Sequence, residues 1–245
     1  LITDRMMYVK DIVHNCALKH GLTATFMPKP LYDEPGNGMH FHIQLRKKGR
    51  NVFYDADGYA GLSETALCFI GGILAHGRSL TAFTNPSTNS YKRLLPGFEA
   101  PVKLFFGLAN RCAAIRIPKY ATSEEAKRIE FRTSDGSCNY YLAMSALLMA
   151  GLDGVKNRIL PDGNGFGPFD DNVFDWPEAE QARLASIPSS LEEALQALED
   201  DHGYLMAGGV FNRELIESWI GEKTKEVVAV RNRPHPFEMN LYYSL

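Results

Sequence analysis

The chain has 245 residues, of which 45% are hydrophobic and 22% are charged, and its formal net charge at pH 7 is −3. Such a length suits one large domain or two small ones, and the composition is typical of a soluble globular protein with a buried core. The slightly negative charge excludes the basic surface of a nucleic-acid-binding protein. No apolar run approaches the roughly 20 residues of a membrane-spanning helix, and no signal peptide is visible, so we expect neither nucleic acid nor membrane as a partner.

The first part of the chain contains a helix, two strand-like segments and a second helix. In chain order, the predicted elements are a helix over 4–20, a strand over 22–27, a strand over 39–46 and a helix over 63–79. Apolar residues recur at helical spacing in the first and last of these segments and alternate in the two strands. Ser63 is the predicted N-cap of the second helix.

The middle of the chain is predicted to be a loop, a short helix, two strands and a longer helix, over 85–101, 104–110, 113–118, 128–133 and 139–156. The last helix is apolar nearly all round, which predicts that it is buried. Its Gly151 and Gly154 favour close packing against a neighbouring helix.

The last third begins with residues 160–187, which are rich in proline, glycine and aspartate and predict a long loop. Residues 188–245 are predicted to be a helical region with an extended tail. A capping box at 190–193 opens one helix, and a second helix covers 213–226. Strands and helices do not alternate as βαβ units, so the chain is predicted to be α+β with a largely antiparallel sheet.

Two predicted strands carry polar residues on one face. In the strand 128–132, alternation places Arg128, Glu130 and Arg132 on one side and the apolar residues on the other. In the strand 39–45, it places His40 and His42 together. Arginine, glutamate and histidine on such faces suit a site for anionic groups and a divalent metal.

Alternative interpretations remain open for each of these residues taken singly. Two histidines on a strand are more often surface or core residues than metal ligands, but a glutamate on an adjacent strand would favour a metal site, and Glu130 is the candidate. A single arginine is usually a solvated cation. Five arginines within 40 residues instead indicate a site for carboxylate and phosphoryl oxygens. They are Arg93, Arg111, Arg116, Arg128 and Arg132.

Two loops are further candidates for a site. Glu99 lies between two prolines and could be either an exposed acid or a general base on a lid. Gly36 and Gly38 would allow a ligand to approach the backbone closely. No P-loop, Rossmann fingerprint or nucleophile elbow is present. The four cysteines are scattered without a C-x-x-C pair, which is typical of reduced thiols in a cytoplasmic protein.

Five ordered motifs resemble the bacterial class I glutamine synthetases. They are ATFMPKPL at 24–31, GMHFH at 38–42, NPSTNSYKRLLPGFEAP at 85–101, RIEFR at 128–132 and LLMAGLDG at 147–154. The resemblance extends to the terminal LYYSL. It implies the catalytic-domain fold of that family, in which a largely antiparallel partial barrel packs with helices. It also implies ATP-dependent ligation of ammonia to glutamate through a γ-glutamyl phosphate, with Mg²⁺ or Mn²⁺, in a homo-oligomer of two stacked rings.

The resemblance also implies a role for each candidate residue. His40 and Glu130 correspond to metal ligands, and His42, Arg111, Arg116 and Arg128 to ATP-binding residues. Glutamate-binding positions correspond to Gly36, Arg93, Glu99 and Arg132. Glu99, Arg111 and Arg132 correspond to catalytic residues, with Glu99 on a lid and Arg132 nearest the transferred phosphoryl group.

The chain departs from the family pattern at several positions. Pro35 replaces the usual asparagine before Gly36, so a substrate contact through that side chain is not expected. Phe174 occupies the position of the tyrosine that is adenylylated in one branch of the family. Because phenylalanine has no hydroxyl group, we predict no such regulation at this site. The run 133–139 also differs from the usual proline-containing one.

No segment corresponds to the family's small N-terminal β-domain or to the part that supplies its first metal-binding glutamates. We therefore expect the chain to be the C-terminal part of the catalytic domain and to be inactive alone, because one histidine and one glutamate cannot hold two divalent ions tightly. Alternatives are a γ-glutamyl ligase for a polyamine or other amine, an inactive regulatory relative, and a generic α+β domain. The apolar tail 237–245 could dock on another surface or fold back on its own domain.

Overall fold

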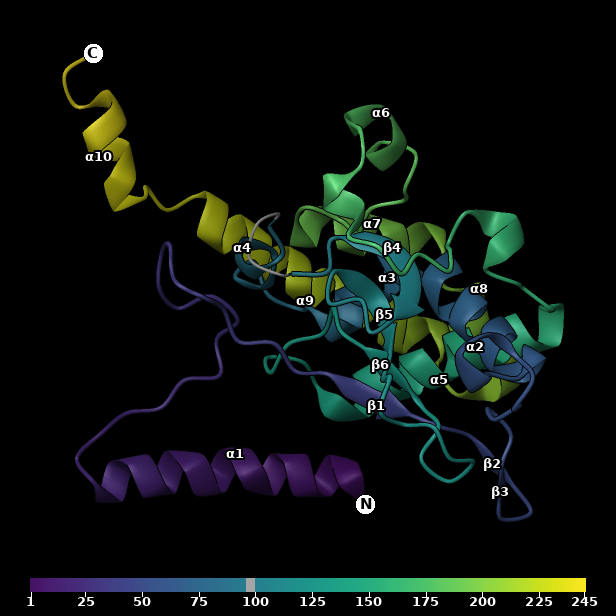
Figure 1. Cartoon of the computed structure of the whole chain (residues 1–245). Helices are drawn as coiled ribbons and strands as arrows, with labels where there is room; N and C mark the ends of the chain where they lie inside the picture. Colours follow the sequence, from purple (N-terminus) through teal and green to yellow (C-terminus); the bar gives the residue numbers. More distant parts are fainter. Residues whose placement is uncertain (96–99) are drawn as a thin grey trace.

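The computed structural model describes residues 1–95 and 100–245. Its main sheet has four strands in the order β1-β6-β5-β4, with the bounds β1 Phe41–Ile43, β6 Ile129–Phe131, β5 Ala113–Ile117 and β4 Lys103–Leu108 (Figure 1). The pairs β1–β6 and β6–β5 are antiparallel, whereas β5–β4 is parallel. A separate hairpin joins β2 (Arg46–Lys47) to β3 (Arg50–Asn51). The predicted α+β class with a largely antiparallel sheet is confirmed, and the sheet is open rather than closed into a barrel.

Helices make up most of the remaining regular structure. The α-helices are α1 Ile2–Lys19, α2 Glu64–Ala75, α3 Gly77–Thr84, α4 Ser90–Arg93, α5 Tyr140–Asn157, α6 Glu178–Gln181, α7 Leu191–Asp200, α8 Gly203–Met206, α9 Arg213–Arg231 and α10 Pro236–Tyr242. Short 3₁₀ turns lie at Tyr59–Gly61, Asp162–Asn164, Val173–Asp175 and Ala207–Gly209. Ser63 and Ser190 cap α2 and α7 as predicted, since each side-chain oxygen accepts from the backbone three residues on.

Helices α2 and α5 pack closely because glycines face each other across the contact. A Cβ added at Gly72 would lie 2.2 Å from the carbonyl oxygen of Ala150, and one at Gly154 would lie 2.2 Å from that of Cys68. A Cβ at Gly151 would meet the ring of Phe69 at the same distance. The close packing predicted for Gly151 and Gly154 is confirmed. This contact fixes α5, and with it the segment that leads from β6 into α5.

The structure differs from several predicted elements. The helix predicted over 63–79 is two helices, α2 and α3, with 75° between them, and the loops predicted over 85–101 and 160–187 contain α4 and α6. Residues 104–110 were expected to be helical, but β4 occupies 103–108. Phe105 and Phe106 on its opposite faces are 0% and 1% exposed, and a strand buried on both sides lacks the alternation that separates strand from helix. Residues 22–27 have no partner strand among the described residues and form coil. The tail contains α10, which Pro236 begins at a position that suits proline.

Both ends of the chain project from the body of the molecule (Figure 1). Of the residues of α1, all of them described, only Thr3 is buried. The apolar side chains of α10 and the last residues are exposed, so the tail does not fold back on its own domain. Phe174 lies in the turn Val173–Asp175 and packs against the core.

In the described part of the chain no single helix is long and apolar enough to cross a membrane. Only the bent pair α2 and α3, with 75° between them, passes that test of length and composition.

A polar cluster lies where α2 ends and α3 begins. His76 Nδ1 is 2.9 Å from a carboxylate oxygen of Asp201, and its Nε2 is 3.1 Å from Asp153. The ring stacks on Tyr204 with 3.9 Å between centroids, and Ser79 donates to Asp201. Burial lowers the pKa of His76, but the hydrogen bonds and negative charges of the two aspartates outweigh burial, so the pKa is raised. The side chain of His76 thus links α2 to α5 and to the end of α7.

The raised pKa of His76 predicts a pH-dependent stability. A group whose pKa is raised on folding contributes stability that is fully present below its unfolded pKa, about 6.5 for histidine. That contribution is lost as the pH rises through the folded value. We therefore expect His76→Gln to reduce the free energy of unfolding more at about pH 6 than at about pH 9. Urea unfolding at both values measures this, and an equal penalty at the two would contradict it.

Candidate functional site

Strand β6 places its charged residues on one face and its apolar residues in the core. Ile129 and Phe131 are 0% and 1% exposed within the main apolar cluster. Glu130 faces the other way and is opposite His42 of β1 and Arg116 of β5 in the strand register. The alternation predicted from RIEFR is therefore present, and it brings groups from three strands together.

Glu130 is the centre of this cluster. Its side chain is 2% exposed and accepts hydrogen bonds from Arg116 Nε at 2.5 Å and Arg132 Nη1 at 3.0 Å. The third contact is His40 Nδ1, at 2.8 Å. Burial raises the pKa of Glu130, but the hydrogen bond from Arg116 and the nearby positive charges outweigh burial, and the pKa is lowered. The carboxylate is therefore ionised and fully paired, as a buried charge must be.

His40 is held as a neutral imidazole. Burial and the positive charge of Arg132 lower its pKa to about 4 despite the opposing effect of Glu130. The 2.8 Å contact assigns the proton to Nδ1, which donates to the carboxylate, and leaves the lone pair on Nε2. The contact also fixes the orientation of the imidazole ring relative to Glu130.

Arg93, from α4, packs against the loop that carries Gly36 and Gly38. Its side chain is buried and donates from Nη1 to the carbonyl of Thr133 at 2.8 Å. A Cβ at Gly36 would lie 3.0 Å from Arg93 Cγ, and one at Gly38 would lie 2.5 Å from Nη2 and 3.3 Å from His40 Nε2. The glycines are thus needed for the loop to approach Arg93, and they bring the guanidinium beside His40.

A second group of polar side chains consists of His42 of β1, Arg128 and Tyr120. Arg128 donates from Nε to His42 Nδ1 at 3.3 Å and from Nη2 to the hydroxyl of Tyr120 at 3.2 Å. Its guanidinium also lies 5.3 Å from the centroid of that ring. Burial lowers the pKa of His42. Tyr120 was missed from the sequence, where an isolated tyrosine in a loop carries no signal.

The two remaining candidate residues are Arg111 and Glu99. The carbonyl of Arg111 accepts from Arg132 Nε at 3.2 Å, so its main chain borders the Glu130 cluster. Glu99 lies outside the described residues.

His40 and Glu130 fit a divalent ion as two donors of a larger set. The imidazole of His40 is neutral and the Glu130 carboxylate is ionised, and these are the states in which both groups can bind a metal. Hard cations take several oxygen ligands. In residues 1–95 and 100–245, however, no group of three or more histidine, cysteine, aspartate or glutamate side chains could hold a metal. These residues therefore supply part of a metal site and not a complete one.

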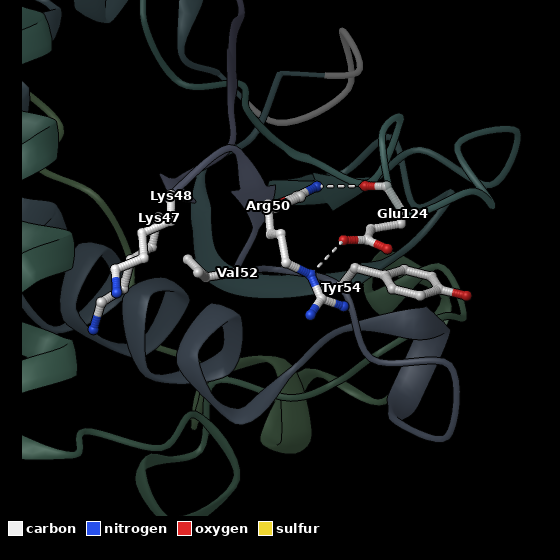
Figure 2. Close-up of a pocket in the computed structure, with 7 residues that line it drawn as sticks. Lys47, Lys48, Arg50, Val52, Tyr54 and Glu124 are labelled. Atoms are coloured by element: carbon white, nitrogen blue, oxygen red, sulfur yellow. Dashed lines mark hydrogen bonds and ion pairs between the residues drawn. The ribbon is translucent and has the colours of Figure 1, made fainter.

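A basic hollow lies beside the β2–β3 hairpin (Figure 2), and no residue of the Glu130 cluster lines it. It has a volume of about 480 Å³, and Lys47, Lys48 and Arg50 are among its lining residues. Arg50 Nε lies 3.6 Å from Glu124 on the facing loop. Sequence reasoning did not identify this hollow, because the glutamate that closes it is 74 residues away in the chain.

Comparison with known proteins identifies the family of the chain. Residues 2–242 match the family described as glutamine synthetase, catalytic domain. The glutamine synthetase of Streptomyces filamentosus is 52% identical over 243 residues, which cover 99% of this chain and 51% of that protein. That of Pseudomonas aeruginosa is 51% identical over 242 residues, which cover 99% and 50%. The chain spans about half the length of the curated relatives it matches.

Solved structures agree with the sequence matches. Plasmodium falciparum glutamine synthetase has a TM-score of 0.86 and 33% identity, and the match covers 98% of this chain and 53% of that chain. A structure of GmaS in complex with ADP has a TM-score of 0.86 and 34% identity and covers 99% and 54%. The resemblance to bacterial glutamine synthetases is confirmed, and the chain belongs to the glutamine synthetase family.

Proposed function

We propose that this chain supplies substrate-, nucleotide- and metal-binding residues to an enzyme that ligates ammonia to glutamate at the expense of ATP. The observation that supports this best is the buried Glu130 carboxylate, which meets His40, Arg116 and Arg132 in a member of the glutamine synthetase family. In the proposed reaction, the γ-carboxylate of glutamate attacks the γ-phosphorus of ATP and releases ADP. Ammonia then attacks the acyl phosphate, a proton is removed, and phosphate leaves.

His40 and Glu130 would hold Mg²⁺ or Mn²⁺ together with ligands from outside the described residues. When bound, the ion would neutralise part of the negative charge on the transferred phosphoryl group. The two groups already face each other, with His40 Nδ1 2.8 Å from the Glu130 carboxylate.

The two arginines on Glu130 have spare donors for phosphoryl oxygens. Arg132 uses Nη1 for Glu130 and Nε for the carbonyl of Arg111, and no atom of the described residues accepts from its Nη2. Arg116 uses Nε for Glu130, and within the same residues its two Nη groups have no acceptor. Guanidinium groups fixed in this way would stabilise charge that develops during phosphoryl transfer without reorganising.

The remaining candidate residues would bind the two larger substrates. His42 of β1 and Arg128, which directly precedes β6, contact each other and would contact the nucleotide, together with Arg111 and Arg116. Arg93 would bind glutamate together with the backbone at Gly36, which packs against the Arg93 side chain. Glu99 is proposed from the resemblance alone, as the lid residue that shields the acyl phosphate and accepts a proton.

Arg93→Ala is expected mainly to raise the KM for glutamate in the complete enzyme, because the guanidinium would bind glutamate equally in the ground and transition states. Initial rates at varied glutamate measure this. Arg158→Ala is the control, since Arg158 forms an exposed pair with Glu64 and contacts no residue of the Glu130 cluster. A large loss of kcat with unchanged KM would contradict the role of Arg93.

The proposed function is tested by glutamine formation from glutamate, ATP and ammonia in the complete protein. Because the described residues supply only part of a metal site, the 245-residue chain alone is expected to form no measurable glutamine. A panel of amines, including polyamines, in place of ammonia tests the alternative of another γ-glutamyl ligase. Turnover with another amine but not with ammonia would overturn the proposed substrate.

We also infer a homo-oligomer of two stacked rings for the complete enzyme. The support in this chain is the exposed apolar tail, in which Phe237, Leu241 and Tyr243 are 56%, 52% and 83% exposed. Such a surface is otherwise unfavourable in water. Light scattering on the complete protein with and without residues 236–245 tests whether the tail joins subunits.

A further inference from the structure

The guanidinium of Arg93 is held entirely by main-chain oxygens in the described structure. Nη1 donates to the carbonyls of Thr133 at 2.8 Å and Ser134 at 3.2 Å, and Nη2 donates to that of Arg132 at 3.3 Å. No carboxylate of the described residues pairs with it. The orientation of Arg93 therefore depends on the path of the backbone that follows β6.

Asn85, the C-cap of α3, holds the backbone that follows β6 through its side-chain amide. Its Nδ2 donates to the carbonyl of Thr133 at 2.8 Å, which is the same oxygen that accepts from Arg93, and to Asp135 Oδ2 at 3.0 Å. Its Oδ1 accepts from the hydroxyl of Thr84 at 2.8 Å. Asn85 is 0% exposed, so none of these contacts is exchanged with water.

Asp135 holds the same backbone segment through its carboxylate and its own amide. Its Oδ1 accepts from the amide and hydroxyl of Ser137 at 2.9 and 2.5 Å, and its own amide donates to the carbonyl of Thr84 at 3.2 Å. Asp135 is also 0% exposed. A buried carboxylate is costly unless it is fully hydrogen-bonded, and a satisfied buried network makes the local structure rigid. Neither Asn85 nor Asp135 contacts the Glu130 cluster.

We propose that Asn85 and Asp135 are positioning residues that act on Arg93 through the carbonyls of Thr133 and Ser134. They hold the guanidinium so that Nη2 faces Gly38 and the Nε2 side of His40 before any ligand arrives. A cation oriented in advance binds a carboxylate without an additional ordering cost. The identity of that carboxylate as glutamate rests on the proposed function, whereas the orientation of Arg93 does not.

The orientation is tested in the free chain by nitrogen-15 NMR of the arginine guanidinium groups. The Arg93 signals are assigned by their loss in Arg93→Lys. We expect them to be resolved in the wild type, because hydrogen bonds to three carbonyls restrict rotation of the group. In Asn85→Ala and Asp135→Asn they should shift or broaden. In Asp135→Asn, the new side-chain NH2 group would face a group that itself donates, either Asn85 Nδ2 or the amide of Ser137.

The matched control is Asn51→Ala. Asn51 is also a buried asparagine that donates to two carbonyls, those of Glu124 and Lys127, but it lies at the β2–β3 hairpin. We expect this variant to be destabilised and to leave the Arg93 signals unchanged. Arg93 signals that stay in place in folded Asn85→Ala, or that move as much in Asn51→Ala, would overturn the proposal.

A milder variant covers the case in which the first two do not fold. Ser137→Ala removes one of the contacts to Asp135 and should shift the Arg93 signals to a smaller extent. In the complete enzyme it should raise the glutamate KM by a smaller factor than Arg93→Ala does. If the Arg93 signals shift in the variants as expected but the complete wild-type protein forms no glutamine, the positioning role is upheld and the proposed function is refuted. Unchanged signals in Ser137→Ala would refute the positioning role.

Discussion

Gly72→Ala is expected to destabilise the chain by more than about 3 kcal/mol, beyond the usual range for an overpacked core. The added methyl group would lie 2.2 Å from the carbonyl oxygen of Ala150 and 2.6 Å from the amide nitrogen of Gly154. Both atoms belong to the backbone of α5, so neither can rotate out of the way. The two helices would have to separate, and the packing along their whole contact would be lost. Urea unfolding measures the change.

Gly221→Ala is the matched control for this experiment. Gly221 lies in α9, and a Cβ there would meet no atom within 4 Å. Alanine favours a helix over glycine by roughly 0.8–1 kcal/mol, so this variant should be slightly stabilised. If Gly72→Ala unfolds at the same urea concentration as the wild type, α2 and α5 do not approach each other as described.

Glu130→Ala is expected to cost about 3–5 kcal/mol of folding free energy, because it removes one partner of a buried ion pair and leaves the other uncompensated. Arg132 is 8% exposed in its side chain and would lose its carboxylate partner, and Arg116 and His40 would lose theirs. In the complete enzyme the same change should abolish turnover, because a proposed metal ligand and the orientation of His40 are lost together. Unfolding of the chain and glutamine formation by the complete protein are the two measurements.

Glu64→Ala is the control for the loss of a glutamate. Its side chain is 59% exposed and pairs with Arg158 at the surface, so its removal should change the stability by less than about 1 kcal/mol. A folded Glu130→Ala protein with wild-type turnover would show that the buried carboxylate is neither a ligand nor a support for the site.

Those parts of the site that depend on which face of a strand a residue occupies could be predicted from the sequence. A strand has a period of two, so RIEFR could place Glu130 opposite the core, and GMHFH could place His40 and His42 on one side, before any pairing was known. That His40 and Glu130 meet was a hypothesis that depended on β1 and β6 being neighbours. The two strands are paired, and the 2.8 Å contact between His40 Nδ1 and the Glu130 carboxylate confirms it.

Other features have no signature in the sequence. The anchors of Arg93 are backbone carbonyls, and every residue has one, so no residue type announces them. Strand β4 was mistaken for a helix because its two faces are both buried. Tyr120 is placed beside Arg128 by a loop whose path depends on tertiary contacts.

Helix α1 has a consequence for how the stability of this chain is measured. It is continuous over Ile2–Lys19, yet only Thr3 of it is buried, and it meets the remainder of the molecule through side-chain contacts such as the hydroxyl of Tyr141 on Asp4. Circular dichroism would count α1 together with α2 and α5, but amide deuteration should be fast along α1 and slow along the other two. A melting curve recorded by ellipticity would therefore combine two transitions, and the fluorescence of Trp219, which packs against the core, would follow only the second.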